Sequence, residues 1–262
     1  VENEKLGEDT ITDFLLIDFS STDYVGHQFG VNSKEVQDTY IRLDKEIERL
    51  LDYFDNKVGP GNYTLFLTAD HGATGVPGFL KDSKIPVNYF DAYKWKKHIE
   101  SSVIELFKTK KIVVGNSNNQ IFLNHNLIEK TNLNFEDVQR KIIKIMQSFP
   151  GIANVYSSQE ILTSNNDHHT TLVRNGFNKN LSGDIVYTLM PNWTFPRKGS
   201  THGSMYNHDT HVPLIFYGNG IKKGSISRRT DVIDIAPTIA TVLGINSPDG
   251  STGQVIHEVV YD

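Results

Sequence analysis

Two stretches decide the fold of this chain: FLLIDFSSTDYVGHQFG at residues 14–30 and YTLFLTADHG at residues 63–72. Each opens with a short apolar run, as buried strands do, and then turns polar and glycine-containing. We therefore predict one strand over Phe14–Phe19 and a second over Tyr63–Ala69. The second run is apolar along nearly its whole length, as in parallel strands that are covered on both faces.

A long amphipathic helix is predicted between these two strands. It begins near Asn32, where Glu35 completes a capping-box pattern. Its apolar residues follow at spacings of three and four, as one buried stripe requires: Val36, Tyr40, Leu43, Ile47, Leu50, Leu51 and Phe54. Strand, helix and strand make a right-handed βαβ unit, and open α/β sheets bind ligands outside the carboxyl ends of their strands. The fold class is thus α/β, and both polar segments are expected at one edge of the sheet.

The composition and the apolar pattern of the sequence change between residues 79 and 200, where Asn and Lys are frequent and apolar runs are short. Helices are predicted over Ala92–Phe107 and Glu136–Met146, and strands near Lys111–Val114, Gln120–Leu123 and Asp184–Leu189. The core pattern resumes with VPLIFY at 212–217 and ends in a helix over Asp234–Leu243. We therefore expect a core formed by residues 1–78 and 201–262, interrupted by an inserted α+β subdomain at 79–200.

Five carboxylate and imidazole side chains are candidate metal ligands: Asp23, His27, Asp70, His71 and His202. Carboxylate oxygens and imidazole nitrogens are the ligands that catalytic zinc sites use. An ionisable pair at the end of a buried strand is costly unless a metal or a partner compensates it, although a capped strand end with solvated side chains is the alternative. The order D-x-x-x-H, D-H-G and T-H-G favours a two-metal hydrolase over one structural zinc.

The other histidines are expected to have structural or surface roles. His168 and His169 lie in a polar stretch and are predicted to be at the surface, and His98, His125 and His257 have no ligand-like neighbours in sequence. His208 and His211 are harder to assign because both follow His202 closely. For His211 a hydrogen-bonded structural role is favoured, with contact to the metal site as the alternative.

Composition excludes several classes of function. The 262 residues carry a net charge of -5, which argues against nucleic acid or an anionic membrane as the main partner. The absence of cysteine excludes disulfides, thiolate zinc sites and cysteine nucleophiles. No apolar run approaches the roughly 20 residues that span a bilayer.

Three motifs carry a resemblance to a known family: SSTDYVGHQFG, TADHG and THGSMYNHDTHVPLIFYG. They resemble the metal-binding signatures of the alkaline phosphatase superfamily, and most of all its bacterial periplasmic phosphate-irrepressible branch, which is related to nucleotide pyrophosphatase/phosphodiesterases. The ending DVIDIAPTIATVLGI resembles the last helix of that superfamily. The resemblance implies an alkaline-phosphatase-like three-layer sandwich with a mostly parallel central sheet and an α+β insertion.

The resemblance also implies a site with two zinc ions. Asp23, His27 and His202 would hold the first zinc, and Asp70 with His71 would contribute to the second. In that family the nucleophilic Thr or Ser comes from an N-terminal segment, as do the residues that bind the phosphoryl oxygens. No stretch of this sequence matches that segment. The chain is thus expected to be the C-terminal part of a periplasmic or secreted phosphate monoester hydrolase, and to be nearly inactive alone.

Other functions are left open by the same motifs. A phosphodiesterase, a nucleotide pyrophosphatase or a sulfatase of the superfamily would share these ligands, and a non-catalytic relative could keep zinc for stability alone. A phosphate ester is the expected substrate, with neither nucleic acid nor membrane as a partner. If a strand and a helix normally cover the sheet, the isolated chain exposes an apolar edge and is expected to self-associate.

Overall fold

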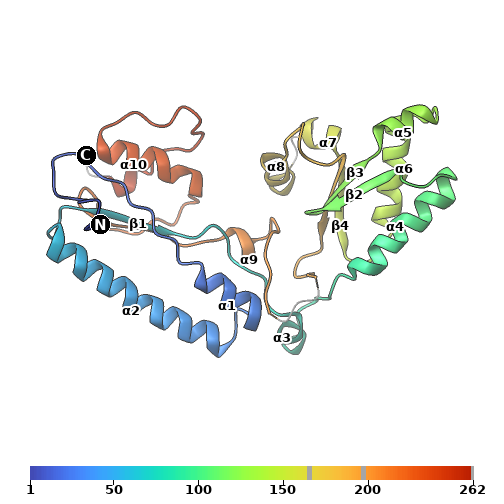
Figure 1. Ribbon diagram of the computed structural model, residues 1–262. Helices are drawn as coiled ribbons and strands as arrows, with labels where there is room; N and C mark the ends of the chain where they lie inside the picture. Colours follow the sequence, from blue (N-terminus) through green and yellow to red (C-terminus); the bar gives the residue numbers. More distant parts are fainter. Residues whose placement is uncertain (164–166, 196–198, 261–262) are drawn as a thin grey trace. The chain divides into compact units, whose positions relative to one another are not determined.

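The computed structural model describes residues 1–163, 167–195 and 199–260, and the chain divides into two compact units (Figure 1). Unit 1 comprises Val1–Thr22, Gln37–Gly72 and His211–Asp262, and unit 2 comprises Asp23–Val36 and Ala73–Thr210. Both units are therefore assembled from segments that are distant in sequence. The predicted limits of the inserted subdomain stay a prediction.

Unit 1 is built around a two-stranded sheet. Its elements are most of α2 (Lys34–Lys57), β1 (Thr64–Thr68), β6 (Leu214–Gly218), the 3-10 turns η1 (Val232–Asp234) and η2 (His257–Val259), and α10 (Ile235–Leu243). The two strands run antiparallel, with Phe66 opposite Phe216. Helices α2 and α10 lie on opposite sides of this sheet, which gives the layering of an α/β fold (Figure 1).

The long helix and the last helix of unit 1 form where the sequence predicts them. Helix α10 ends at Gly244, whose φ of 65° is the left-handed conformation that a helix-ending glycine supplies at little cost. Along α2, most of the predicted apolar stripe is buried or half-buried, but Tyr40 is exposed.

The expected strand over Phe14–Phe19 is not formed, and this prediction was wrong. All six residues are exposed, and no strand of the described residues pairs with them. A strand needs a neighbour whose backbone groups complete its ladder. The only neighbour of β1 among the described strands is the antiparallel β6, so the predicted parallel pairing is also absent. Phe14 nevertheless stacks on Phe66 at a centroid distance of 6.3 Å.

Unit 2 contains a second, four-stranded sheet with its own hydrophobic core. Its elements are most of α1 (Ser21–Phe29), α3 (Pro77–Asp82), α4 (Ala92–Phe107), β2 (Val113–Ser117), β3 (Gln120–Leu123), α5 (His125–Lys130), α6 (Phe135–Gln147), β4 (Ile152–Ser157), α7 (Ser158–Thr163), α8 (His168–Asn175), β5 (Ile185–Leu189) and α9 (Asn207–Thr210). The strands are antiparallel in the order β2-β3-β5-β4, and α6 packs against β4 and α4. Trp95, Ile142 and Met146 are among the fully buried residues of this core.

Most of the elements predicted for this region are present. Helices α4 and α6 and strands β2, β3 and β5 lie at or within a few residues of their predicted positions, whereas β4 and the short helices were not predicted. In β4 the buried apolar residues Ile152 and Val155 are three apart, so the strand lacks the alternation that identifies strands in sequence. Among the described residues, no helix is long and apolar enough to cross a bilayer.

We expect the chain to self-associate through residues 14–19, because Phe14 and Leu16 are 67% and 76% exposed. Replacing both with lysine should shift the protein toward the monomer in sedimentation velocity experiments, since each charge opposes apolar contact. Leu181→Lys is the matched control, because Leu181 is 78% exposed but lies in unit 2. A chain that is monomeric at every concentration would contradict this expectation.

A second prediction concerns acid sensitivity in unit 1. The Arg228 guanidinium donates hydrogen bonds of 2.5 and 2.7 Å to Glu258 and lowers the pKa of that carboxyl to about 2. Because this is below the value of about 4.3 for an unfolded chain, the pair stabilises the fold above that pH and loses its effect as pH falls toward 2. In an NMR titration of Arg228→Gln, the pKa of Glu258 should rise from about 2 toward the ordinary value of about 4.3. An unchanged titration would show that Arg228 does not hold it.

Candidate metal centre

Asp23 and His27 lie on helix α1, not in a loop as expected. A spacing of four residues puts both side chains on one helical face, and His27 Nε2 is 3.2 Å from Asp23 Oδ2. The loop prediction rested on Gly26 and Gly30, which are typical of turns. In the structure Gly26 is buried inside the helix, and Gly30 closes it with a φ of 92° and an N–H that donates to the Gly26 carbonyl at 2.8 Å.

His202 meets this helical pair from 175 residues further along the chain. Its Nε2 is 3.3 Å from His27 Nε2 and 3.6 Å from Asp23 Oδ1, and the two imidazole rings lie 5.0 Å apart. All three side chains are part-buried and belong to unit 2. The structure thus brings together the three residues predicted to hold the first metal. We refer to Asp23, His27 and His202 as the triad.

Ser200 attaches the loop that carries His202 to helix α1. Its N–H donates to the Gly26 carbonyl at 2.9 Å, and its Oγ accepts from the Val31 N–H at 3.0 Å. Its carbonyl oxygen lies 2.9 Å from His27 Nδ1. A carbonyl can only accept, so Nδ1 carries a proton in this bond, and Nε2 is the nitrogen of the neutral ring that can bind a metal.

The triad fits a small divalent cation in donor type and in spacing. Tetrahedral zinc with bonds of about 2.0–2.1 Å requires ligand atoms about 3.3–3.4 Å apart. The two Nε2 atoms lie 3.3 Å apart, and Asp23 approaches His27 with Oδ2 at 3.2 Å and His202 with Oδ1 at 3.6 Å, so the donors are close to this spacing. A backbone carbonyl that fixes the far nitrogen of a histidine is also the usual arrangement around metal ligands. The triad is therefore a candidate for one metal ion.

Gly199 is a positioning residue that the sequence motifs did not reveal. A Cβ atom at this position would lie 2.5 Å from the carbonyl oxygens of both Gly26 and His27, and 2.8 Å from the backbone nitrogen of Gly30. Only glycine lets the loop approach the helix so closely. The sequence signal was the pair of small residues, Gly199 and Ser200, directly before Thr201-His202.

Asp70 and His71 follow strand β1 and belong to unit 1. His71 Nδ1 lies 2.8 Å from the Gly72 carbonyl oxygen, so this ring also has its proton on Nδ1. Its Nε2 is 3.4 Å from Asp70 Oδ2, and the Asp70 side chain is 88% exposed. The pair thus offers a carboxylate and an imidazole nitrogen side by side, and its predicted part in a second metal site stays a prediction.

The remaining histidines lie outside the triad, and the hydrogen-bonded structural role favoured for His211 stays a prediction. His168 and His169 are exposed on α8, His98 lies 3.2 Å from the Ile145 carbonyl oxygen, and His125 pairs with Asp184 at 2.7 Å. His208 Nε2 is 3.2 Å from Ser204 Oγ. His211 is exposed in unit 1, and His257 lies in η2.

Gly199→Ala and Ser200→Ala should have different effects, although the residues are neighbours. Gly199→Ala should push the loop off α1 and weaken zinc binding at least tenfold, because His27 loses its Ser200 carbonyl partner. Ser200→Ala keeps that carbonyl but removes the hydroxyl that accepts from the Val31 N–H. It should lower the free energy of unfolding by about 1–2 kcal/mol and change the zinc affinity little. Isothermal titration calorimetry and urea unfolding measure the two quantities. Equal zinc affinity in both variants would refute the role given to Gly199.

Comparisons with known proteins agree with the fold. The family described as type I phosphodiesterase/nucleotide pyrophosphatase matches residues 2–213. Over 99% of its length the chain is 40% identical to a Myroides odoratus protein named calcium-transporting ATPase, and 36% identical to alkaline phosphatase PafA of Elizabethkingia meningoseptica. Each match covers 48% of the relative, so the chain spans about half the length of these curated relatives.

Comparison with solved structures also supports the alkaline-phosphatase-like fold. The crystal structure of wild-type PafA aligns with a TM-score of 0.93 at 36% identity, covering 99% of this chain and 50% of that one. Murine ectonucleotide pyrophosphatase/phosphodiesterase 5 aligns with a TM-score of 0.63 at 14% identity, covering 92% of this chain and 57% of that one. The second match shows the fold alone. Together they confirm the predicted alkaline-phosphatase-like α/β fold.

Proposed function

Because the chain belongs to the type I phosphodiesterase/nucleotide pyrophosphatase family, we propose that it is part of a zinc-dependent phosphate monoester hydrolase. The observation that carries this proposal is the meeting of Asp23 and His27 with His202, 175 residues apart in sequence, as one set of metal donors. The similarity to PafA, which is named an alkaline phosphatase, supports monoesters as the substrate class.

The electrostatics of the triad suit this reaction. A phosphate monoester dianion needs positive charge at the site. The triad itself carries a single negative charge, on its one carboxylate, beside two imidazoles. A divalent ion held there would leave a net positive charge. When bound, zinc would supply Lewis-acid stabilisation to the phosphoryl and leaving-group oxygens. The protein's own part is to hold the donors in place: Ser200 fixes the His27 ring, and α1 fixes Asp23 beside it.

Asp70 and His71 are proposed as ligands of a second zinc. The support is their donor chemistry, the fixed tautomer of His71 and the resemblance of TADHG to the family's ligand motif. An attacking Thr or Ser is expected from the same resemblance, and we assign it to no residue of this chain. A periplasmic or secreted location is proposed on the resemblance as well.

A phosphodiesterase is the second candidate, and the family match favours it. The full-length protein should hydrolyse p-nitrophenyl phosphate with a higher kcat/KM than bis-p-nitrophenyl phosphate or p-nitrophenyl sulfate. The reverse order would favour the diesterase or the sulfatase, and no hydrolysis of any of them would favour a non-catalytic zinc protein.

Zinc binding to this chain tests the proposal directly. His27→Ala should weaken zinc binding at least tenfold in calorimetry after removal of metal with EDTA, because one of three donors is lost. His168→Ala is the matched control, since His168 is an exposed histidine of the same unit. In the full-length protein, His27→Ala should also lower kcat/KM for p-nitrophenyl phosphate. Unchanged zinc affinity and unchanged hydrolysis would together contradict the proposal.

A further inference from the structure

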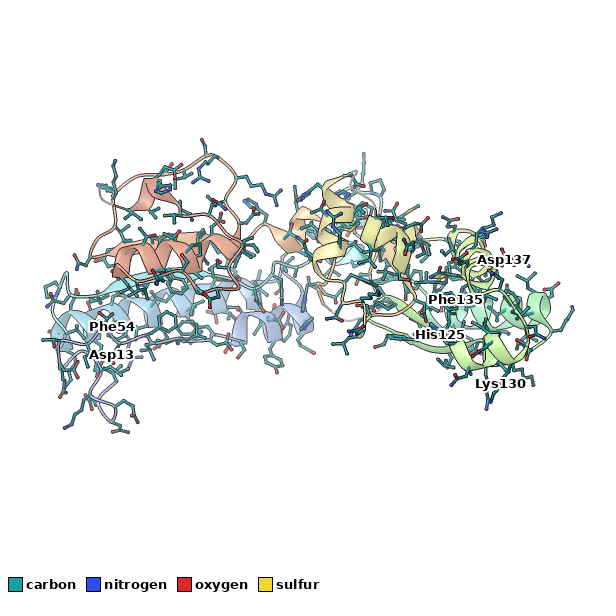
Figure 2. All side chains as sticks on the ribbon, turned by 90° about the horizontal axis from the view of Figure 1, so that it is seen from above. Asp13, Phe54, His125, Lys130, Phe135 and Asp137 are labelled. Carbon is teal, nitrogen blue, oxygen red and sulfur yellow. The ribbon has the colours of Figure 1, made fainter. Side chains whose placement is uncertain are left out.

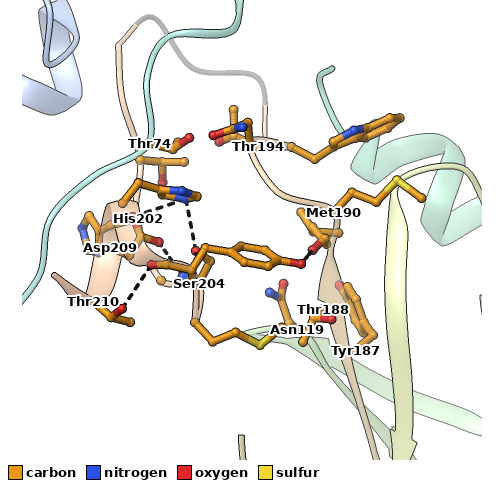
Figure 3. A pocket seen from close by; sticks show the side chains of 18 of the residues that line it. Thr74, Asn119, Tyr187, Thr188, Met190, Thr194, His202, Ser204, Asp209 and Thr210 are labelled. Atoms are coloured by element: carbon orange, nitrogen blue, oxygen red, sulfur yellow. Dashed lines mark hydrogen bonds and ion pairs between the residues drawn. The ribbon is translucent and has the colours of Figure 1, made fainter. Parts of the chain in front are cut away.

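A cavity of about 440 Å³ lies in unit 2, and His202 of the triad forms part of its wall (Figure 3). Its other walls include residues 118–119, part of α8, β5 and its end, residues 192–195 and the loop 201–210. Cavities of about 300–1,000 Å³ are typical of small-molecule sites. No role has been assigned to this cavity by the motifs or by the proposed chemistry of the triad.

The loop that delivers His202 is the same loop that closes the cavity. The Tyr206 hydroxyl donates to the Leu189 carbonyl at the end of β5, at 2.9 Å. The Ser204 N–H donates to Asp209 Oδ2 at 2.7 Å, which folds the loop back on itself. The wall is therefore tied to the sheet at one end and to helix α1, through Ser200, at the other. A preformed cavity of this kind costs little ordering entropy on binding.

The walls are apolar, with a few neutral polar groups. Leu189, Met190, Trp193 and Met205 supply apolar and aromatic surface, and Asn119 and Asn192 supply amide donors and acceptors. Figure 3 shows Asn119, Thr188 and Met190 arranged around the cavity. Methionine and tryptophan adapt well to a flat aromatic ring.

The described walls carry few charged groups, which favours a neutral ligand. None of the described residues that line the cavity is Lys or Arg, and its two histidines are His202 of the triad and His208, whose Nε2 lies 3.2 Å from Ser204 Oγ. The only lining carboxylate, Asp209, is 4% exposed, with Oδ2 bonded to Ser204 and Oδ1 buried. A cation would therefore meet no accessible counter-charge. A neutral group is the occupant that fits.

We propose that this cavity binds the leaving group of the substrate, and that this group is a neutral aromatic alcohol. The inference rests on the proposed function: a phosphoryl group held at the triad would have its ester oxygen next to the cavity, because His202 belongs to both. The ring would lie against Met190 and Trp193, and a heteroatom would bond the Asn119 amide.

The test is direct binding of 2-naphthol to this chain, without metal. In ¹H–¹⁵N NMR spectra recorded with EDTA, the indole N–H signal of Trp193 should shift saturably. The chain has two tryptophans, and Trp95 in the buried core should not respond. The variant Trp193→Phe assigns the signals. Choline and inorganic phosphate, tested as a cation and an anion, should leave both signals unmoved.

Two variants locate the binding site. Met190→Asp should weaken 2-naphthol binding about tenfold, because it puts a charge into the cavity wall at a residue that is already 43% exposed. Leu181→Asp, at an exposed residue that does not line the cavity, should leave the affinity unchanged. Absence of a saturable shift, a shift with choline instead, or equal loss in both variants would overturn the proposal. Since EDTA is present throughout, such a failure leaves the zinc-binding test of the triad untouched.

Discussion

The contact on which the site depends is the hydrogen bond between His27 Nδ1 and the Ser200 carbonyl, which joins residues 173 positions apart. It fixes the tautomer of His27, turns Nε2 toward Asp23 and His202, and holds the loop that carries His202. This bond can form only because Gly199 has no side chain that would separate the loop from α1. A substitution at Gly199 would therefore act on the metal site without replacing any of its donors.

The same loop couples two regions with different chemistry. One side of it presents His202 to the triad, and the other forms the wall of the neutral cavity around Met205 and Tyr206. Figure 2 labels His125 and Phe135 of unit 2, whose ring centroids lie 4.6 Å apart. Strand β5 of the antiparallel sheet contributes Thr188 and Leu189 to the cavity wall, and Asn119 and Asn192 supply its amide groups.

Much of this arrangement could be predicted from sequence, because periodic patterns and ligand motifs are local signals. Helix α4 begins and ends as predicted, and the convergence of His202 with Asp23 and His27 followed from the motif order. The helix α1 was missed because Gly26 suggested a loop. Phe14–Phe19 was assigned to a buried strand because its apolar run satisfies the pattern, but a pattern cannot supply the neighbouring strand that burial requires. Gly199 was not singled out, because its role depends on a contact between distant backbones that the pair of small residues Gly199 and Ser200 does not reveal by itself.

The most direct measurement of the central claim is zinc-edge anomalous diffraction from crystals of the protein grown with zinc. The account predicts an anomalous peak about 2.0–2.1 Å from His27 Nε2, His202 Nε2 and a carboxylate oxygen of Asp23. A peak only at other residues, or none near the triad at full zinc saturation, would contradict it.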